Sequence, residues 1–118
     1  MITGRVTEEG VPVVMLPVAG QLWPGIIDTG FNGDVELPER LRPVVQARFI
    51  GRMASLLASG QRMEEDLYLV EFPFDGQVVQ AEATFVPNGD ILLGTRLLRS
   101  YRLEIDFPAQ SVVLQAVA

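Results

Sequence analysis

The side chains able to do acid–base chemistry in this chain are carboxylates, because the other residues commonly used for it are missing. The sequence has no His, Cys or Lys, and all nine of its positive residues are Arg. A Ser-His-Asp triad, a Cys-His pair, a zinc site built on Cys or His, a phosphate loop with its Lys and a disulfide are therefore excluded. An enzyme of this composition must use carboxylates, alone or with a hard metal such as magnesium.

The carboxylate with the most informative surroundings is Asp28, in the triplet Asp28-Thr29-Gly30. Ile26 and Ile27 place Asp28 directly after an apolar strand, so its carboxylate starts near the core and needs donors or a partner. Thr29 supplies a hydroxyl, and Gly30 lets another part of the backbone approach closely. Taken alone, the triplet is more often an ordinary turn in which the Asp bonds its own backbone.

The elements that must position this triplet are short and β-prone. The chain has 11 Gly and 8 Pro, and the runs between them predict a mainly β domain. We expect strands over 11–18, 22–27, 35–37, 77–86, 91–93, 102–107 and 111–117. Prolines place the first of these near a sheet edge. A long hairpin over 46–74 has its tip at 58–60, and Asp75-Gly76 forms the next tight turn.

Two stretches have helical features. Pro38 begins a helical turn or short helix that reaches about Val45. Thr95 to Tyr101 has helical spacing, with Leu97, Leu98 and Tyr101 turned inward and Thr95 as the N-cap.

Composition limits the class of partner. The 118 residues fit one domain, and the net charge of −6 with no basic run argues against nucleic acid and an anionic membrane surface. No apolar run is long enough to span a membrane. The segment Met1–Gly10 lacks the basic start and apolar stretch of a signal peptide. We therefore expect a cytoplasmic protein.

Besides the Asp28 triplet, the sequence has a second signal, an apolar run that ends in glycine just before the expected helix: Ile91-Leu92-Leu93-Gly94. Together they resemble the retropepsin-like aspartic proteases, and most closely the small bacterial predicted aspartyl proteases of that clan. The resemblance spans about Leu22 to Phe107. It implies a single domain over 1–118 with a closed retropepsin-like β-barrel, a flap hairpin and one short helix near the C-terminus.

The resemblance also implies the site residues. Asp28, Thr29 and Gly30 are expected to be catalytic, with Thr29 bonding across the active site. The expected substrate-binding residues follow the triplet or form the flap tip: Phe31, Asn32, Gly33, Leu57, Ala58, Ser59 and Gly60. No metal and no cofactor are implied.

Three positions depart from the retroviral pattern. Phe31 replaces a small residue, and Asn32 replaces the usual Asp. Thr95 follows Gly94 where Arg is usual, with Arg96 one position later. The Asp–Arg pair near the active site is therefore missing or rebuilt.

Only one Asp-Thr/Ser-Gly triplet occurs, whereas the fold needs two aspartates. The second must come from an identical partner, so we expect a homodimer that hydrolyses peptide or protein substrates through two Asp28 carboxylates. In resembling families the terminal strands of two subunits interleave. We therefore expect the terminal segments of this chain, Met1 to Val6 and Ser111 to Ala118, to have unpaired edges in an isolated subunit. The alternative is a weak or inactive dimer that binds peptides or proteins. A third possibility is a magnesium enzyme that uses Asp28, Asp34 and Asp90.

The remaining charges have simpler interpretations. Asp34 and Glu36 alternate with apolar residues and are expected on the surface. Glu64-Glu65-Asp66 is expected to be a solvated strand edge that deters aggregation. The arginines at 96, 99 and 102 are expected to pair with Glu104 or Asp106.

Overall fold

Strands make up most of the chain, as the sequence predicts. The computed structural model describes residues 1–117. Its strands are β1 (Ile2–Val6), β2 (Pro12–Val18), β3 (Gln21–Ile27), β4 (Val35–Pro38), β5 (Arg48–Leu56), β6 (Arg62–Phe74), β7 (Gln77–Val86), β8 (Ile91–Leu93), β9 (Tyr101–Asp106) and β10 (Ser111–Ala116). A short 3-10 helix, η1 (Glu39–Val44), follows β4, which confirms the helical turn expected after Pro38.

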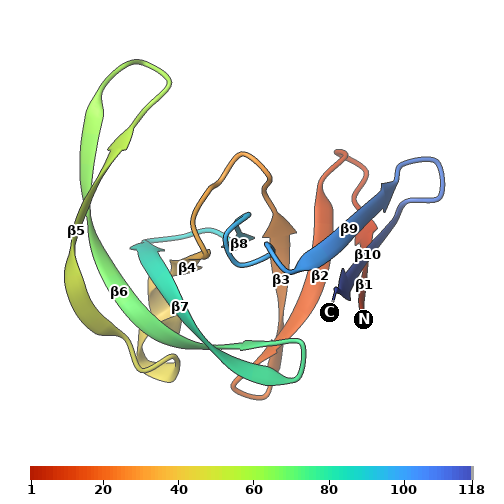
Figure 1. Cartoon of the computed structure of the whole chain (residues 1–118), viewed down its shortest axis with the longest axis horizontal. Coiled ribbons are helices and arrows are strands. Elements are labelled where there is room, and N and C mark those ends of the chain that lie inside the picture. Colours follow the sequence, from red (N-terminus) through yellow and green to blue (C-terminus); the bar gives the residue numbers. More distant parts are fainter. Residues whose placement is uncertain (118) are drawn as a thin grey trace.

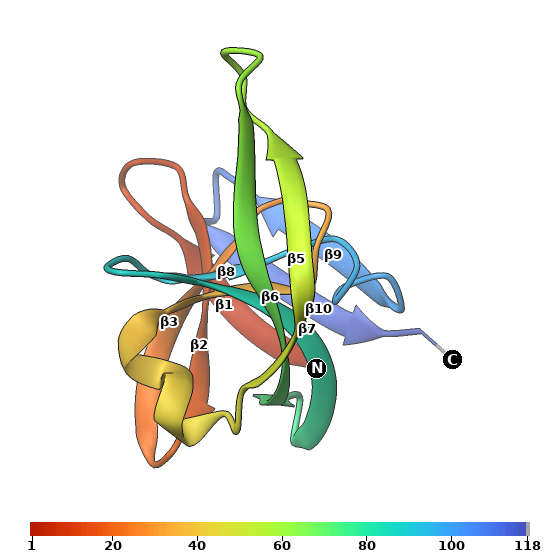
Figure 2. The same ribbon diagram turned by 90° about the vertical axis from the view of Figure 1, so that its left-hand side faces the viewer.

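The sheet is open, so the predicted closed barrel is wrong. The ten strands form one sheet in the order β5-β6-β7-β4-β8-β3-β2-β1-β10-β9. Strands β5 and β9 are its two edges and lie on opposite sides of the molecule (Figure 1). The physical reason is visible in Figure 2, where the β5–β6 hairpin stands up from the body instead of curling back to pair with the other edge.

Local turn residues set the hairpins that the sequence predicts. Asp75 and Gly76 both have positive φ, 53° and 74°, which matches the twist that a two-residue turn needs between β6 and β7. The tip of the β5–β6 hairpin closes through the Gly60 N–H, which donates to the Leu57 carbonyl at 2.9 Å. Gly60 has a φ of 86°, a conformation that glycine adopts without steric cost.

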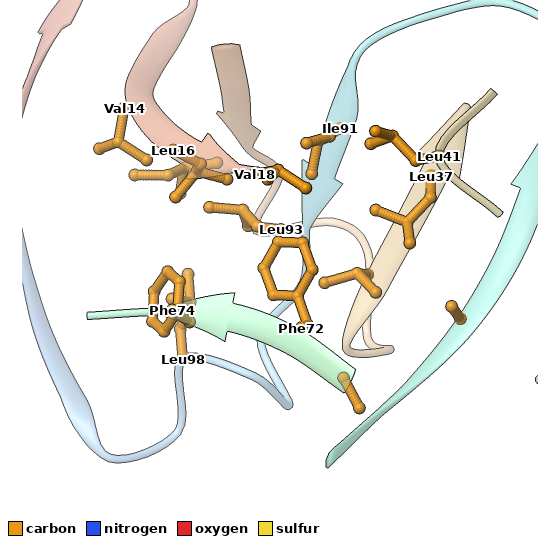
Figure 3. Close-up of a cluster of buried hydrophobic side chains, with 14 of the residues drawn as sticks. Val14, Leu16, Val18, Leu37, Leu41, Phe72, Phe74, Ile91, Leu93 and Leu98 are labelled. Atoms are coloured by element: carbon orange, nitrogen blue, oxygen red, sulfur yellow. The ribbon is translucent and has the colours of Figure 1, made fainter. Parts of the chain in front are cut away.

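Strand β8 is the centre of the fold. It pairs in parallel with β3 and antiparallel with β4, so it joins the two halves of the sheet. Ile91 and Leu93 are completely buried. Leu93 and Phe72 of β6 point into the middle of the apolar cluster (Figure 3). The apolar run that the sequence analysis singled out is therefore the innermost strand, which fits its unbroken hydrophobic pattern.

The short helix predicted after Gly94 does not form. The segment 95–100 is a pair of turns, closed by the Leu98 N–H to the Gly94 carbonyl at 3.3 Å and the Tyr101 N–H to the Leu98 carbonyl at 2.9 Å. Leu98 is buried and Tyr101 is half-buried, so the inward-facing positions are correct. A helix this short has a costly first turn, and pairing of β9 with β10 already begins at Tyr101.

The two terminal strands pair on both sides within the chain over part of their length, contrary to the expectation that they are left open. Strand β1 lies between β2 and β10, and β10 lies between β1 and β9. Among residues 1–117, Ile2 and Thr3 of β1 have no partner on the β2 side, and Gln115 and Ala116 of β10 have none on the β1 side. Within residues 1–117, no helix is long and apolar enough to cross a membrane.

Candidate active site

Asp28 stands where β3 ends, beside the end of β8. Its N–H donates to the Leu93 carbonyl at 3.0 Å, which continues the parallel pairing of the two strands by one residue. Its Oδ1 accepts the Gly30 N–H at 3.0 Å. The side chain is half-buried. The carboxylate is thus held at a strand end by one backbone donor and remains open to a ligand.

Backbone hydrogen bonds tie the loop after Asp28 to the segment after β8. The Gly94 N–H donates to the Asp34 carbonyl at 2.9 Å, and the Thr95 N–H donates to the Phe31 carbonyl at 2.9 Å. The Arg96 N–H donates to the Gly33 carbonyl at 3.2 Å. A methyl group added to Gly94 would overlap the Gly33 carbonyl oxygen. Gly94 is therefore the close-approach glycine on which the shape of the Asp28 loop depends.

A cleft of about 630 Å³ opens between this loop and the β5–β6 hairpin. Its lining residues come from the loop, from both hairpin strands and from β4, β7 and β8. They are Asp28, Gly30, Phe31, Asn32, Gly33, Asp34, Val35, Glu36, Met53, Ser55, Leu56, Glu65, Leu67, Glu82, Thr84, Leu92 and Arg96.

The structure brings most of the expected site residues to this cleft, but not all of them. Asp28 and Gly30 line it, together with the three predicted substrate contacts Phe31, Asn32 and Gly33. Thr29 is exposed and is absent from the lining. The predicted tip contacts also lie outside it and are exposed: Leu57, Ala58, Ser59 and Gly60. The strands of the hairpin, not its tip, border the cleft in a single chain.

Phe31 does not stand across the cleft. Its ring packs against the backbone of Gly33 and Gly94, where added methyl groups would come within 2.7 Å and 2.8 Å of ring carbons. The two glycines provide the space for the ring. The bulky residue after the triplet is thus accommodated by the loop itself.

Asp34 and Arg96 form an Asp–Arg pair, which the sequence analysis expected to be either missing or rebuilt. Asp34 is buried, accepts the Glu82 N–H at 2.9 Å and lies 3.9 Å from the Arg96 Nε. Arg96 Nη1 also approaches the Glu82 carboxylate at 2.8 Å. An Asp–Arg pair beside the Asp28 loop is therefore present, rebuilt from residues other than 32 and 95. The expectation that Asp34 is a surface charge is wrong.

Glu36 is a further cleft residue that sequence reasoning placed on the surface. It is paired with Thr84 of β7 and Leu92 of β8 in register, and all three line the cleft. Burial first, then the charges of Glu65 and Asp28, raise the pKa of Glu36 above its ordinary value. Only the non-local register shows that Glu36 shares a face with these partners, so no sequence signal identified it.

Other expectations for charged residues are partly met. Arg102 pairs with Glu104 at 3.5 Å, as expected, whereas Arg96 pairs with Asp34 and Glu82 instead. Glu64 and Asp66 both pair with Arg52 on the exposed hairpin. Across residues 1–117, no group of three or more carboxylates is arranged to hold a metal ion, and Asp90 does not line the cleft.

Replacing Glu36 tests this electrostatic description. A carboxyl whose pKa is raised by folding destabilises the fold once it ionises, so its stabilising contribution is lost as pH rises through the folded-state pKa. Glu36→Gln should therefore raise the unfolding temperature at about pH 7 and leave it unchanged at about pH 3, where both forms are neutral. The gain should stay below about 1 kcal/mol, because solvent screens a half-exposed group.

The matched control is Glu9→Gln, on the exposed turn between β1 and β2. It should give no comparable gain at neutral pH. A Glu36→Gln protein that is less stable than wild type at neutral pH would contradict the assigned cause.

Comparison with known proteins adds the fold class. No family model and no curated protein matches the chain. Among solved structures, a retropepsin-like aspartic protease from Rickettsia conorii aligns at a TM-score of 0.65 and 14% identity, covering 95% of this chain and 87% of that one. Simian foamy virus protease aligns at a TM-score of 0.57 and 23% identity, covering 74% of this chain and 91% of that one. EIAV protease bound to an inhibitor aligns at a TM-score of 0.59 and 15% identity, covering 79% of this chain and 89% of that one.

The chain therefore has the retropepsin-like fold. The carboxylate at the end of β3, the buried apolar strand ending in Gly94 and the projecting hairpin are its landmarks here. This confirms the resemblance seen in the sequence.

Proposed function

We propose that the chain is an aspartic-type endopeptidase that works as a homodimer. The observation that carries the proposal is the place of Asp28, half-buried at a strand end and facing a cleft beneath a long hairpin. The fold supports a protease in general terms, and the composition leaves carboxylates as the acid–base groups. We assign catalysis to Asp28, supported by Thr29 and Gly30.

The proposed chemistry uses two Asp28 carboxylates and one water. Two carboxyl groups in close contact cannot both ionise readily, so the pair holds one proton. The ionised oxygen takes a proton from the water, which attacks the peptide carbonyl carbon. The protonated oxygen donates a hydrogen bond to the carbonyl oxygen as negative charge develops there. A single chain presents one Asp28, so the second must come from an identical subunit.

The cleft supports an extended peptide as substrate. Its 630 Å³ lies within the range of ligand-binding sites, and apolar residues such as Met53, Leu56 and Leu67 face it together with polar backbone. We assign substrate contacts to Phe31, Asn32 and Gly33 on the loop. The hairpin tip, Leu57 to Gly60, contacts substrate only when the hairpin closes over it.

Thr29 has a separate role in the proposal. It is exposed in one chain, which leaves its hydroxyl available to a second subunit. We assign it to a hydrogen bond across the two active-site loops, which fixes the distance between the aspartates.

The alternative, a dimer that binds peptides without cleaving them, rests on crowding of the cleft by Phe31. The packing of this ring on Gly33 and Gly94 weakens that argument. The favoured function is hydrolysis.

A peptide-library digest tests the proposal. The purified protein should cut internal peptide bonds, detected as new termini by mass spectrometry. A peptide with a tetrahedral hydroxyl group at the scissile position should inhibit it, because it resembles the transition state. A metal chelator should have no effect. Binding of library peptides without any new termini, across acidic to neutral pH, would replace this proposal with the binding-module alternative.

A further inference from the structure

The cleft that Asp28 faces has an excess of negative charge. Among its described lining residues, five are acidic and one is basic: Asp28, Asp34, Glu36, Glu65, Glu82 and Arg96. The one guanidinium is already engaged, because Arg96 lies 3.9 Å from the Asp34 carboxylate and 2.8 Å from the Glu82 carboxylate. Two carboxylates besides Asp28 therefore line the cleft without a positive partner there, those of Glu36 and Glu65.

Glu36 belongs to the β4–β7–β8 wall of the cleft. Its register partners, Thr84 of β7 and Leu92 of β8, line the cleft beside it. Within residues 1–117, no Arg lies within ion-pair distance of Glu36. Burial, followed by the charges of Glu65 and Asp28, raises the pKa of Glu36, as is expected for a half-buried carboxyl with no positive neighbour. A positive group on a ligand would stabilise its ionised form.

Glu65 lies on the hairpin wall, in the β5–β6 hairpin that stands up from the body (Figure 2). It is half-buried and directly opposite Met53 of β5, and both residues line the cleft. Successive residues of a strand point to opposite faces, and the neighbours Glu64 and Asp66 both pair with Arg52. Arg52 therefore serves the outer face of the hairpin. Among the described residues, Glu65 has no ion-pair partner.

Apolar side chains accompany both of these carboxylates. Leu92 is the register partner of Glu36, and Met53 is that of Glu65. A Lys or Arg side chain has the matching composition, because its aliphatic stem packs on apolar surface while its positive end needs polar or charged partners. A neutral side chain would fill the apolar part of the cleft but leave both carboxylates without a counter-charge.

We propose that the cleft selects peptides with a Lys or Arg side chain, whose positive end binds between Glu36 of β4 and Glu65 of β6. The stem of that side chain packs on Leu92 and Met53. The inference rests on the proposed function, since it names the substrates of the same site. The binding preference itself can be measured without cleavage.

A competition between charged and uncharged peptides tests the preference. The Asp28→Asn protein is mixed with equal amounts of two nonapeptide pools, which have Lys or norleucine at the centre and random uncharged residues elsewhere. Bound peptides are counted by mass spectrometry. Norleucine keeps the aliphatic stem of Lys and lacks the ammonium group. Lys peptides should be enriched at least about fivefold at neutral pH and low salt, because two carboxylates attract the ammonium group. The enrichment should fall at about 1 M salt.

Substitutions in the same protein assign the preference to its residues. Glu36→Gln and Glu65→Gln should each reduce the enrichment at least about twofold, and the double variant should abolish it. Glu71→Gln is the matched control, because Glu71 is exposed on β6 and lies outside the cleft lining. It should leave the enrichment unchanged. Equal binding of the two pools, no binding of Lys peptides, or an enrichment that survives the double variant would overturn the inference.

The same pools separate this inference from the proposed activity. Cleavage by the wild-type protein with no preference for the Lys pool would overturn the selectivity alone. Enrichment of Lys peptides that depends on Glu36 and Glu65, without new peptide termini from the wild-type protein, would overturn the proposed activity alone.

Discussion

Asp28→Asn should reduce peptide cleavage by about three orders of magnitude while the protein stays folded, because the substitution removes the proposed general acid–base group. Asn has the same shape as Asp, and its side-chain oxygen can still accept the Gly30 N–H that Asp28 accepts at 3.0 Å. The unfolding temperature should therefore change by less than about 4 °C, which corresponds to less than about 1 kcal/mol.

Asp90→Asn provides the matched control. It makes the same chemical change at an exposed residue outside the cleft lining. Its cleavage rate should equal that of the wild type. Near-wild-type cleavage by purified Asp28→Asn would remove Asp28 from the mechanism.

Gly94→Ala should be strongly destabilising. The new methyl group would overlap the Gly33 carbonyl oxygen, a backbone atom held in the Asp28 loop by its hydrogen bond from the Arg96 N–H. Overpacking of this kind costs about 1–3 kcal/mol or more. We expect an unfolding temperature lower by about 10 °C, together with loss of cleavage, because the Asp28 loop must shift.

Gly33→Ala is the informative comparison. Its methyl group would meet only the ring of Phe31, a side chain that can turn away. The loss of stability should be clearly smaller than for Gly94→Ala. Equal unfolding temperatures for Gly94→Ala and the wild type would contradict the close approach of these two segments.

Local sequence signals predicted the turn at Asp28 and the hairpins well. The apolar residues before Asp28 and before Gly94 mark β3 and β8, which the structure pairs directly. Asp75-Gly76 and Gly60 mark the turns because their backbone conformations favour particular residues. Such signals are contained within a few residues, so a sequence alone can carry them.

The wrong predictions concern features that depend on pairing between strands far apart in the sequence. The prolines of the first long strand suggested a sheet edge, yet β2 lies between β1 and β3. Strand β1 pairs only with Pro12 to Val14, so Pro17 lies beyond its end and breaks no hydrogen bond on that side. The open sheet and the cleft positions of Asp34 and Glu36 likewise depend on which strands become neighbours.

A subunit-mixing experiment tests the shared pair of aspartates most directly. Wild-type and Asp28→Asn chains are refolded together at a fixed total concentration, so that subunits pair at random, and the cleavage rate is measured. If both aspartates are required, activity falls as the square of the wild-type fraction, to about one quarter in an equal mixture. A linear fall, to about one half, would show that each subunit works alone and would contradict the shared active site.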